Sequence, residues 1–90
     1  MNIEFTPKAW EDFNYWIQYD ATKVEKINDL MRSIKQNPFK GLGNPEPLRH
    51  QLKGFWSRRI DSEHRLVYRV IGIKEEQKIQ IVQCRYHYNE

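Results

Sequence analysis

A stretch rich in proline and glycine, "NPFKGLGNPEP" at residues 37–47, is the feature that most constrains the fold. It holds three of the four prolines and two of the four glycines of this 90-residue chain. Such a stretch cannot continue a helix and predicts a restricted loop. Helical periodicity lies before it and strand-like alternation after it. The sequence therefore predicts one α+β domain, residues 1–90.

The part before the loop predicts a short strand and two helices. Residues 2–5 alternate in polarity, and Thr6-Pro7 supplies the hydroxyl cap and the proline of a helix start. A break near Asp20 precedes a second helix, which Asn37-Pro38 ends. The apolar stripes of both helices are expected in the core: Ala9, Trp10, Phe13, Trp16 and Ile17 in the first, and Val24, Ile27, Leu30, Met31 and Ile34 in the second.

The part after the loop predicts an antiparallel sheet. Four segments carry strand-like residues: "LRHQL", "FWSRRI", "HRLVYRV" and "KIQIVQCRYHY". The resulting order, β-α-α-β-β-β with short connections, predicts an antiparallel meander that the helix hairpin covers on one face.

Charge is unevenly distributed along the chain. Residues 49–90 hold nine Lys or Arg and five Asp or Glu, and the whole chain has a net charge of +3. This favours a polyanionic partner, nucleic acid before membrane, although a solvated basic face is the alternative. A mean hydropathy of −0.89 argues against a membrane span. With no signal peptide and a single cysteine, Cys84, the protein is expected in the cytoplasm.

Metal and cofactor chemistry is not expected. The three histidines follow no ligand spacing, and Cys84 is interpreted as a buried thiol. The reaction that remains as a candidate is metal-free cleavage of RNA, in which the RNA's own 2′-hydroxyl is the nucleophile. That reaction needs a base, an acid and fixed positive charge around the phosphate.

Glu46 and His87 are candidates for the base and the acid. Glu46 lies between two prolines, which restrain its backbone and pre-position its carboxylate. His87, expected at the end of the last strand, can donate a proton near neutral pH. The alternatives are a solvated loop carboxylate and a surface histidine, and for isolated motifs these are the more common cases.

Arginines are candidates for the positive charge. Arg59 and Arg65 flank the turn "IDSE" on neighbouring strands, so their guanidinium groups are expected to converge on one phosphate. Arg58 has the opposite strand parity and is assigned elsewhere, for example to a salt bridge. Further contacts to RNA, by charge or by stacking, are expected from Arg49, Lys53 and Tyr88.

Four segments carry a family resemblance: "AWEDFNYW", "KINDL", the run from Asn44 to Val70 and the terminal "CRYHY". Together they resemble the YoeB-like toxins of the RelE/ParE superfamily over nearly the whole chain. The resemblance implies a RelE/ParE-like fold and a ribosome-dependent endoribonuclease that cuts mRNA in the A site. It implies Glu46 as general base, His87 as general acid and Arg65 as phosphate ligand, and Arg59 and Tyr88 match family site positions.

The resemblance also implies partners: a YefM-like antitoxin that covers the site, the ribosome and mRNA, and a second copy in a homodimer. Operator DNA would be bound only through the toxin–antitoxin complex. Three features depart from the family pattern. Arg49 stands where a lysine is expected, "GIKEEQK" lengthens one connection, and Asn89-Glu90 extend the chain past Tyr88.

Two other functions remain open. A ParE-like inhibitor of DNA gyrase would share the fold and the basic character but would act by binding. A pseudoenzyme kept as a corepressor with its antitoxin is the second alternative. Presence of Glu46, Arg65 and His87 together favours the nuclease, because a binding inhibitor does not need them.

Overall fold

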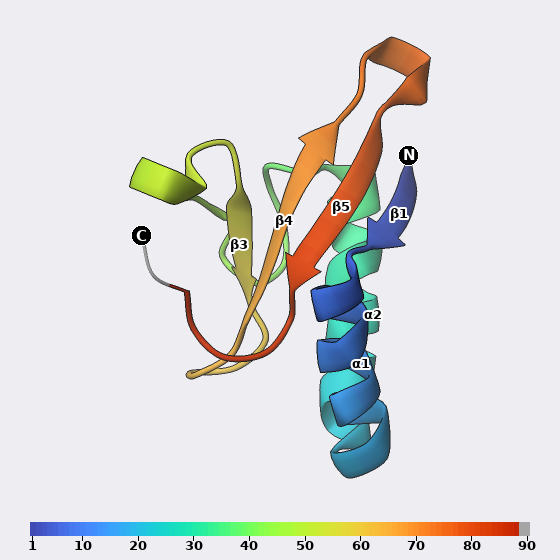
Figure 1. The fold of residues 1–90 in the computed structure, drawn as a ribbon, viewed down its shortest axis with the longest axis vertical. Helices are drawn as coiled ribbons and strands as arrows, with labels where there is room; N and C mark the ends of the chain where they lie inside the picture. The colour runs from blue at the N-terminus through green and yellow to red at the C-terminus, as the bar shows by residue number, and fades with distance from the viewer. Residues whose placement is uncertain (89–90) are drawn as a thin grey trace.

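The computed structural model describes residues 1–88 as an α+β fold, in which two helices cover one face of a five-stranded sheet (Figure 1). The predicted fold class is confirmed. The elements in chain order are β1 (Asn2–Phe5), α1 (Pro7–Tyr19), α2 (Ala21–Gln36), β2 (Glu46–Pro47), η1 (His50–Leu52), β3 (Trp56–Arg59), β4 (Arg65–Ile71), η2 (Lys74–Glu76) and β5 (Lys78–Gln83).

Local caps set the helix boundaries that the sequence predicts. The Thr6 side chain accepts a hydrogen bond from the backbone N–H of Ala9 at 3.2 Å, and Pro7 opens α1. Asp20 ends α1 and caps α2, since its carboxylate accepts from the Thr22 N–H at 3.1 Å. One aspartate therefore makes the turn of the helix hairpin. Within residues 1–88, no helix is long and apolar enough to cross a membrane.

The strand order in the sheet is β1-β5-β4-β3-β2. Strands β3 to β5 are antiparallel neighbours, as predicted, and β2, which lies in the predicted loop, pairs antiparallel with β3. In contrast, β1 runs parallel to β5, with Asn2 opposite Lys78. The expectation of a wholly antiparallel sheet is therefore wrong for β1. Because the helix hairpin separates β1 from the other strands, no tight turn imposes an antiparallel pairing on it.

The structure differs from the prediction in two of the strand segments. "LRHQL" forms η1 instead of a strand, and a positive φ of 56° at His50 excludes extended backbone there. The last strand ends at Gln83, so the prediction of His87 at its end is wrong. Tyr86, with φ of 68°, interrupts the extended conformation before His87 is reached.

The core lies between the helices and the sheet. Ala9 and Trp16 from α1 pack there with three buried residues of α2, namely Ile27, Leu30 and Ile34. Trp10 and Ile17 were also predicted to be core residues, but they are 53% and 54% exposed. The apolar surface of α1 is wider than the strip that α2 and the sheet cover. A second apolar face is left on the outside of the molecule.

A buried arginine joins the central loop to the sheet. Arg58 of β3 has no exposed surface, and its five N–H donors have five acceptors at 2.8–3.2 Å. The acceptors are the hydroxyl groups of Tyr68 and Ser33 and the carbonyl groups of Asn37, Lys40 and Leu42. All are neutral, so the salt bridge predicted for Arg58 is wrong.

Replacing this arginine should destabilise the fold strongly. Arg58→Met keeps a long side chain but leaves several buried acceptors without a donor. We expect a loss of about 3–5 kcal/mol in the free energy of unfolding, measured by urea denaturation. Arg59→Met, one position along and exposed, is the matched control and should change stability by less than about 0.5 kcal/mol. Equal effects of the two substitutions would contradict this account.

Candidate active site

Charged side chains gather on the sheet face that is turned away from the helices. Glu46 lies opposite Ser57 in the β2–β3 pair, and Arg59 lies opposite Arg65 in the β3–β4 pair. Opposed residues, and residues two apart on one strand, point to the same face. Glu46, Arg59 and Arg65 therefore share a face with Ser57. Arg58 points the other way, toward α2.

The segment after β5 brings His87 and Tyr88 to this face. Its described part, through residue 88, curves past β4 and β3 toward the β3 side of the sheet (Figure 1). The Tyr88 hydroxyl lies 3.4 Å from Ser57 Oγ. The His87 ring stacks on the Tyr88 ring, with centroids 4.7 Å apart and an interplanar angle of 24°. Tyr88 thus contacts the strand that lies between Glu46 and Arg65, and His87 is stacked on Tyr88.

The turn between β3 and β4 holds Arg65. Arg65 Nη1 donates to the carbonyl oxygens of Asp61 at 2.8 Å and His64 at 3.1 Å. The Asp61 carboxylate in turn accepts from the backbone N–H groups of Glu63 and His64 and from Lys23 Nζ of α2 at 2.9 Å. Burial alone would raise the pKa of Asp61, but the hydrogen-bonding partners outweigh the effect of burial and lower this pKa to about 2. The charged Asp61 therefore anchors the turn.

The remaining predicted residues are placed differently. Arg49 and Lys53 are exposed and lie at the two ends of η1, in the connection between β2 and β3. They are carried by a loop and are not on the strands that bear Arg59 and Arg65. The structure thus groups five of the seven predicted residues, Glu46, Arg59, Arg65, His87 and Tyr88, while their chemical roles stay predictions.

Three residues of this region had no place in the sequence prediction. Ser57 is buried beneath Tyr88, and its parity with Arg59 is a signal that could have identified it. His64 Nδ1 accepts a hydrogen bond from the Tyr86 N–H at 2.7 Å, so this nitrogen carries no proton. Gln83 binds carbonyl groups of the segment that follows it. No local pattern marks His64 or Gln83, because their partners lie in an irregular turn.

Cys84 has the inert environment that the sequence predicts. The residue is fully buried, and its backbone N–H donates to Asp12 Oδ2 at 3.1 Å. Burial raises the pKa of its thiol to about 12, and the nearby Asp12 acts in the same direction. A nucleophilic thiolate at neutral pH is therefore excluded.

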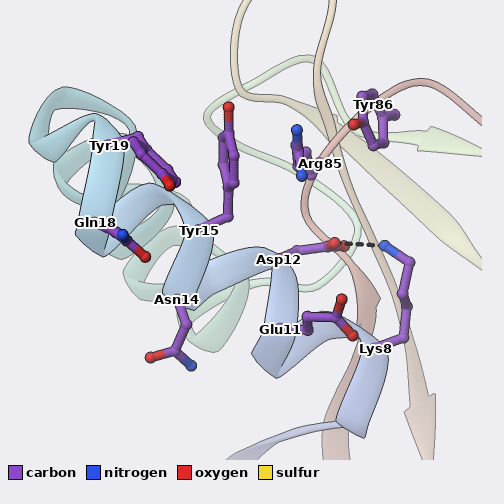
Figure 2. A pocket seen from close by; sticks show the side chains of 9 residues that line it. All are labelled: Lys8, Glu11, Asp12, Asn14, Tyr15, Gln18, Tyr19, Arg85 and Tyr86. Carbon is purple, nitrogen blue, oxygen red and sulfur yellow. Dashed lines mark hydrogen bonds and ion pairs between the residues drawn. The ribbon is translucent and has the colours of Figure 1, made fainter.

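A separate cavity of about 450 Å³ lies between α1 and the C-terminal segment (Figure 2). The Arg85 guanidinium carbon is 3.4 Å from the Tyr15 ring centroid and 4.4 Å from that of Tyr86. Two cations and two carboxylates line it: Lys8, Arg85, Glu11 and Asp12. These charges balance, so the cavity does not have the character of an anion site.

Comparisons with known proteins agree with this geometry. A family model described as "YoeB-like toxin of bacterial type II toxin-antitoxin system" matches residues 5–88. The toxin YoeB of Escherichia coli (strain K12) is 47% identical over 88 residues, which cover 98% of this chain and 100% of the relative. The structure of a YoeB/ParE toxin from Agrobacterium tumefaciens has 51% identity and a TM-score of 0.93, covering 98% of this chain and 100% of that one.

Staphylococcus aureus YoeB, solved as a dimer and in a heterotetrameric complex with YefM, is 46% identical in both structures. The TM-scores are 0.85 and 0.83, and 98% of each chain is covered.

The Asp61 anchor predicts a pH dependence of stability. The pKa of the Asp61 carboxyl is lower in the folded state than its unfolded value of 3.8, so the charged carboxylate stabilises the fold at pH values above 3.8. This stabilisation is lost as the pH falls through about 2. Asp61→Asn should lower the free energy of unfolding by about 1–2 kcal/mol at pH 7. The difference between parent and variant should disappear between pH 4 and pH 2. The control is Asp29→Asn, because Asp29 forms an exposed ion pair with Arg32 within one helix. Urea denaturation measures this difference in the free energy of unfolding. A difference that stays constant from pH 7 to pH 2 would contradict the role of charged Asp61 in holding the turn.

Proposed function

This chain belongs to the YoeB-like toxins of bacterial type II toxin–antitoxin systems, and we propose that it is a ribosome-dependent endoribonuclease, which cleaves mRNA in the ribosomal A site and so blocks translation. The observation that carries the proposal is the grouping of a carboxylate, guanidinium groups and an imidazole on one sheet face. These are the groups that metal-free RNA cleavage requires.

Glu46 and His87 divide the proton transfers between them. The exposed Glu46 carboxylate takes the proton of the 2′-hydroxyl, whose oxygen attacks the adjacent phosphorus. Protonated His87 gives its proton to the departing 5′-oxygen as the bond from that oxygen to phosphorus breaks. The products are a 2′,3′-cyclic phosphate and a 5′-hydroxyl. Each proton transfer is expected to contribute about 10²–10⁴-fold, with neither a metal nor a cofactor.

Arg65 and Arg59 stabilise the charge that develops on the phosphate oxygens. The turn carbonyls already hold Arg65 Nη1, so its guanidinium plane needs little reorganisation during the reaction. Arg59 is exposed on the neighbouring strand. Arg49 and Lys53 would bind phosphates further along the RNA, and the Tyr88 ring would stack on a base.

The proposed partners follow from the relatives. The Staphylococcus aureus complex supports a YefM-like antitoxin, which would cover this face and link the toxin to operator DNA. The exposed apolar face of α1, with Trp10 and Ile17, would be buried in a homodimer like the one described for that YoeB. Light scattering at micromolar concentration should then give twice the monomer mass of 11.0 kDa. The toxin would act in the cytoplasm, where the ribosomes are.

Mapping of mRNA 5′ ends in a purified translation system tests the nuclease. The parent protein should create new ends at A-site codons, and Glu46→Gln and His87→Gln should each lower the cleavage rate by about 10²–10⁴-fold. Glu75→Gln, an exposed carboxyl on η2, is the matched control and should cleave like the parent.

The possible outcomes separate the candidate functions. Intact mRNA together with inhibited DNA gyrase would support the ParE-like alternative and contradict the proposal. Undiminished cleavage by Glu46→Gln and His87→Gln would keep the nuclease and refute the assignment of base and acid.

A further inference from the structure

The side chain of Gln83 closes the turn that follows β5. Its Nε2 donates to the carbonyl oxygens of Arg85 at 2.9 Å and His87 at 2.9 Å, with a longer contact of 3.3 Å to that of Tyr86. A primary amide has two N–H groups, so the two shorter contacts use both of them. One side chain at the strand end thereby gathers the backbone of residues 85–87 into a compact turn.

The same turn contains backbone that does not form readily by itself. Tyr86 has φ of 68°, in the left-handed region, which costs a non-glycine residue about 1–2 kcal/mol. Two neighbours support it: the Tyr86 N–H donates to His64 Nδ1 at 2.7 Å, and the Tyr86 carbonyl accepts from the Arg65 N–H at 3.0 Å. These contacts act before His87, whereas the Gln83 amide binds the carbonyl group of His87 itself.

His87 depends on this backbone for its position. Its side chain is exposed, and its Nδ1 lies 3.1 Å from the carbonyl oxygen of Tyr88, within the same segment. Packing in the core therefore does not fix the imidazole. A proton donor must nevertheless be held within about 0.5 Å of its productive place, and a misplacement of about 1 Å can cost about 100-fold in rate.

We propose that Gln83 is a positioning residue for His87: its amide, bound to the His87 carbonyl, sets where the imidazole meets the RNA. The proposal rests on the nuclease function proposed above. Gln83 acts through the backbone and touches neither the RNA nor the reacting atoms.

The fold should survive the loss of this amide. Cys84, next in the chain, is held independently, because its N–H donates to Asp12 and its carbonyl accepts from Trp16 Nε1 at 2.8 Å. The start of the segment therefore stays attached to α1 when Gln83 changes. Tyr86 also keeps its contacts with His64 and Arg65, so the substitution removes only the amide contacts to the carbonyl groups of residues 85–87.

Gln83→Met removes the hydrogen bonds and keeps the length of the side chain. In single-turnover cleavage on programmed ribosomes, it should lower the maximal rate about 10–100-fold, with the half-saturating concentration unchanged within about twofold. Gln80→Met is the matched control, since Gln80 is on the same strand but bonds with Arg69 and Glu4. It should cleave at the parent rate.

Two further measurements separate positioning from a general loss of structure. Because Gln83 is proposed to act through His87, Gln83→Met should slow a His87→Ala variant no further. NMR relaxation should show the amide order parameters at His87 and Tyr88 falling from about 0.85 to below about 0.6 in Gln83→Met, and unchanged in Gln80→Met.

The outcomes distinguish this inference from the function beneath it. Unchanged order at His87, an unchanged rate, or an equal rate loss in the His87→Ala background would each overturn the role of Gln83. If the parent cleaves no mRNA at all, the nuclease proposal fails and the catalytic part of this role fails with it. The NMR comparison still decides in that case whether Gln83 orders His87.

Discussion

The buried guanidinium group of Arg58 links the central loop to the sheet, and the position of Glu46, the proposed base, depends on it. Its Nη atoms bind three carbonyl groups of the loop at residues 37–42. This loop leads directly to Glu46. It is docked again where the Gly43 carbonyl accepts from the Arg59 N–H at 2.7 Å, and Gly43 has φ of 85° with no room for a Cβ beside α2. The Arg58 guanidinium, which binds only neutral oxygens, thus helps to set where the exposed Glu46 carboxylate lies.

The segment that carries His87, the proposed acid, has a second anchor, on α1. Asp12 and Trp16 are buried helix residues, and both bind the backbone of Cys84 at the point where the chain leaves β5. His87 follows three positions later on backbone closed by Gln83. The core of the protein therefore supplies rigidity to a loop and a tail, neither of which has much buried surface of its own. This explains how a chain of 90 residues can hold in place the solvent-exposed groups that are proposed to be catalytic.

The sequence predicts correctly those features that residues close together in the chain determine. The caps at Thr6 and Asp20 act within three residues, so the helix limits were predicted correctly. Strand parity likewise placed Arg59 and Arg65 on one face. The acceptors of Arg58 come from a loop whose path no short pattern specifies, so a salt bridge was expected in error. The left-handed turn before His87 depends on side chains distant in sequence, such as that of His64. The exposed Trp10 shows that periodicity identifies an apolar face without saying what covers it.

Cleavage of RNA by this sheet face through the 2′-hydroxyl is tested most directly by the chemistry of the cut ends. Mass spectrometry of the mRNA fragments released on ribosomes should find a 2′,3′-cyclic phosphate, or the 3′-phosphate formed from it, on the upstream piece. The downstream piece should carry a 5′-hydroxyl, and both should form in the presence of a metal chelator at a concentration that leaves the ribosomes intact. A 3′-hydroxyl with a 5′-phosphate would contradict the account, because those ends require an attacking water in place of the RNA's own oxygen.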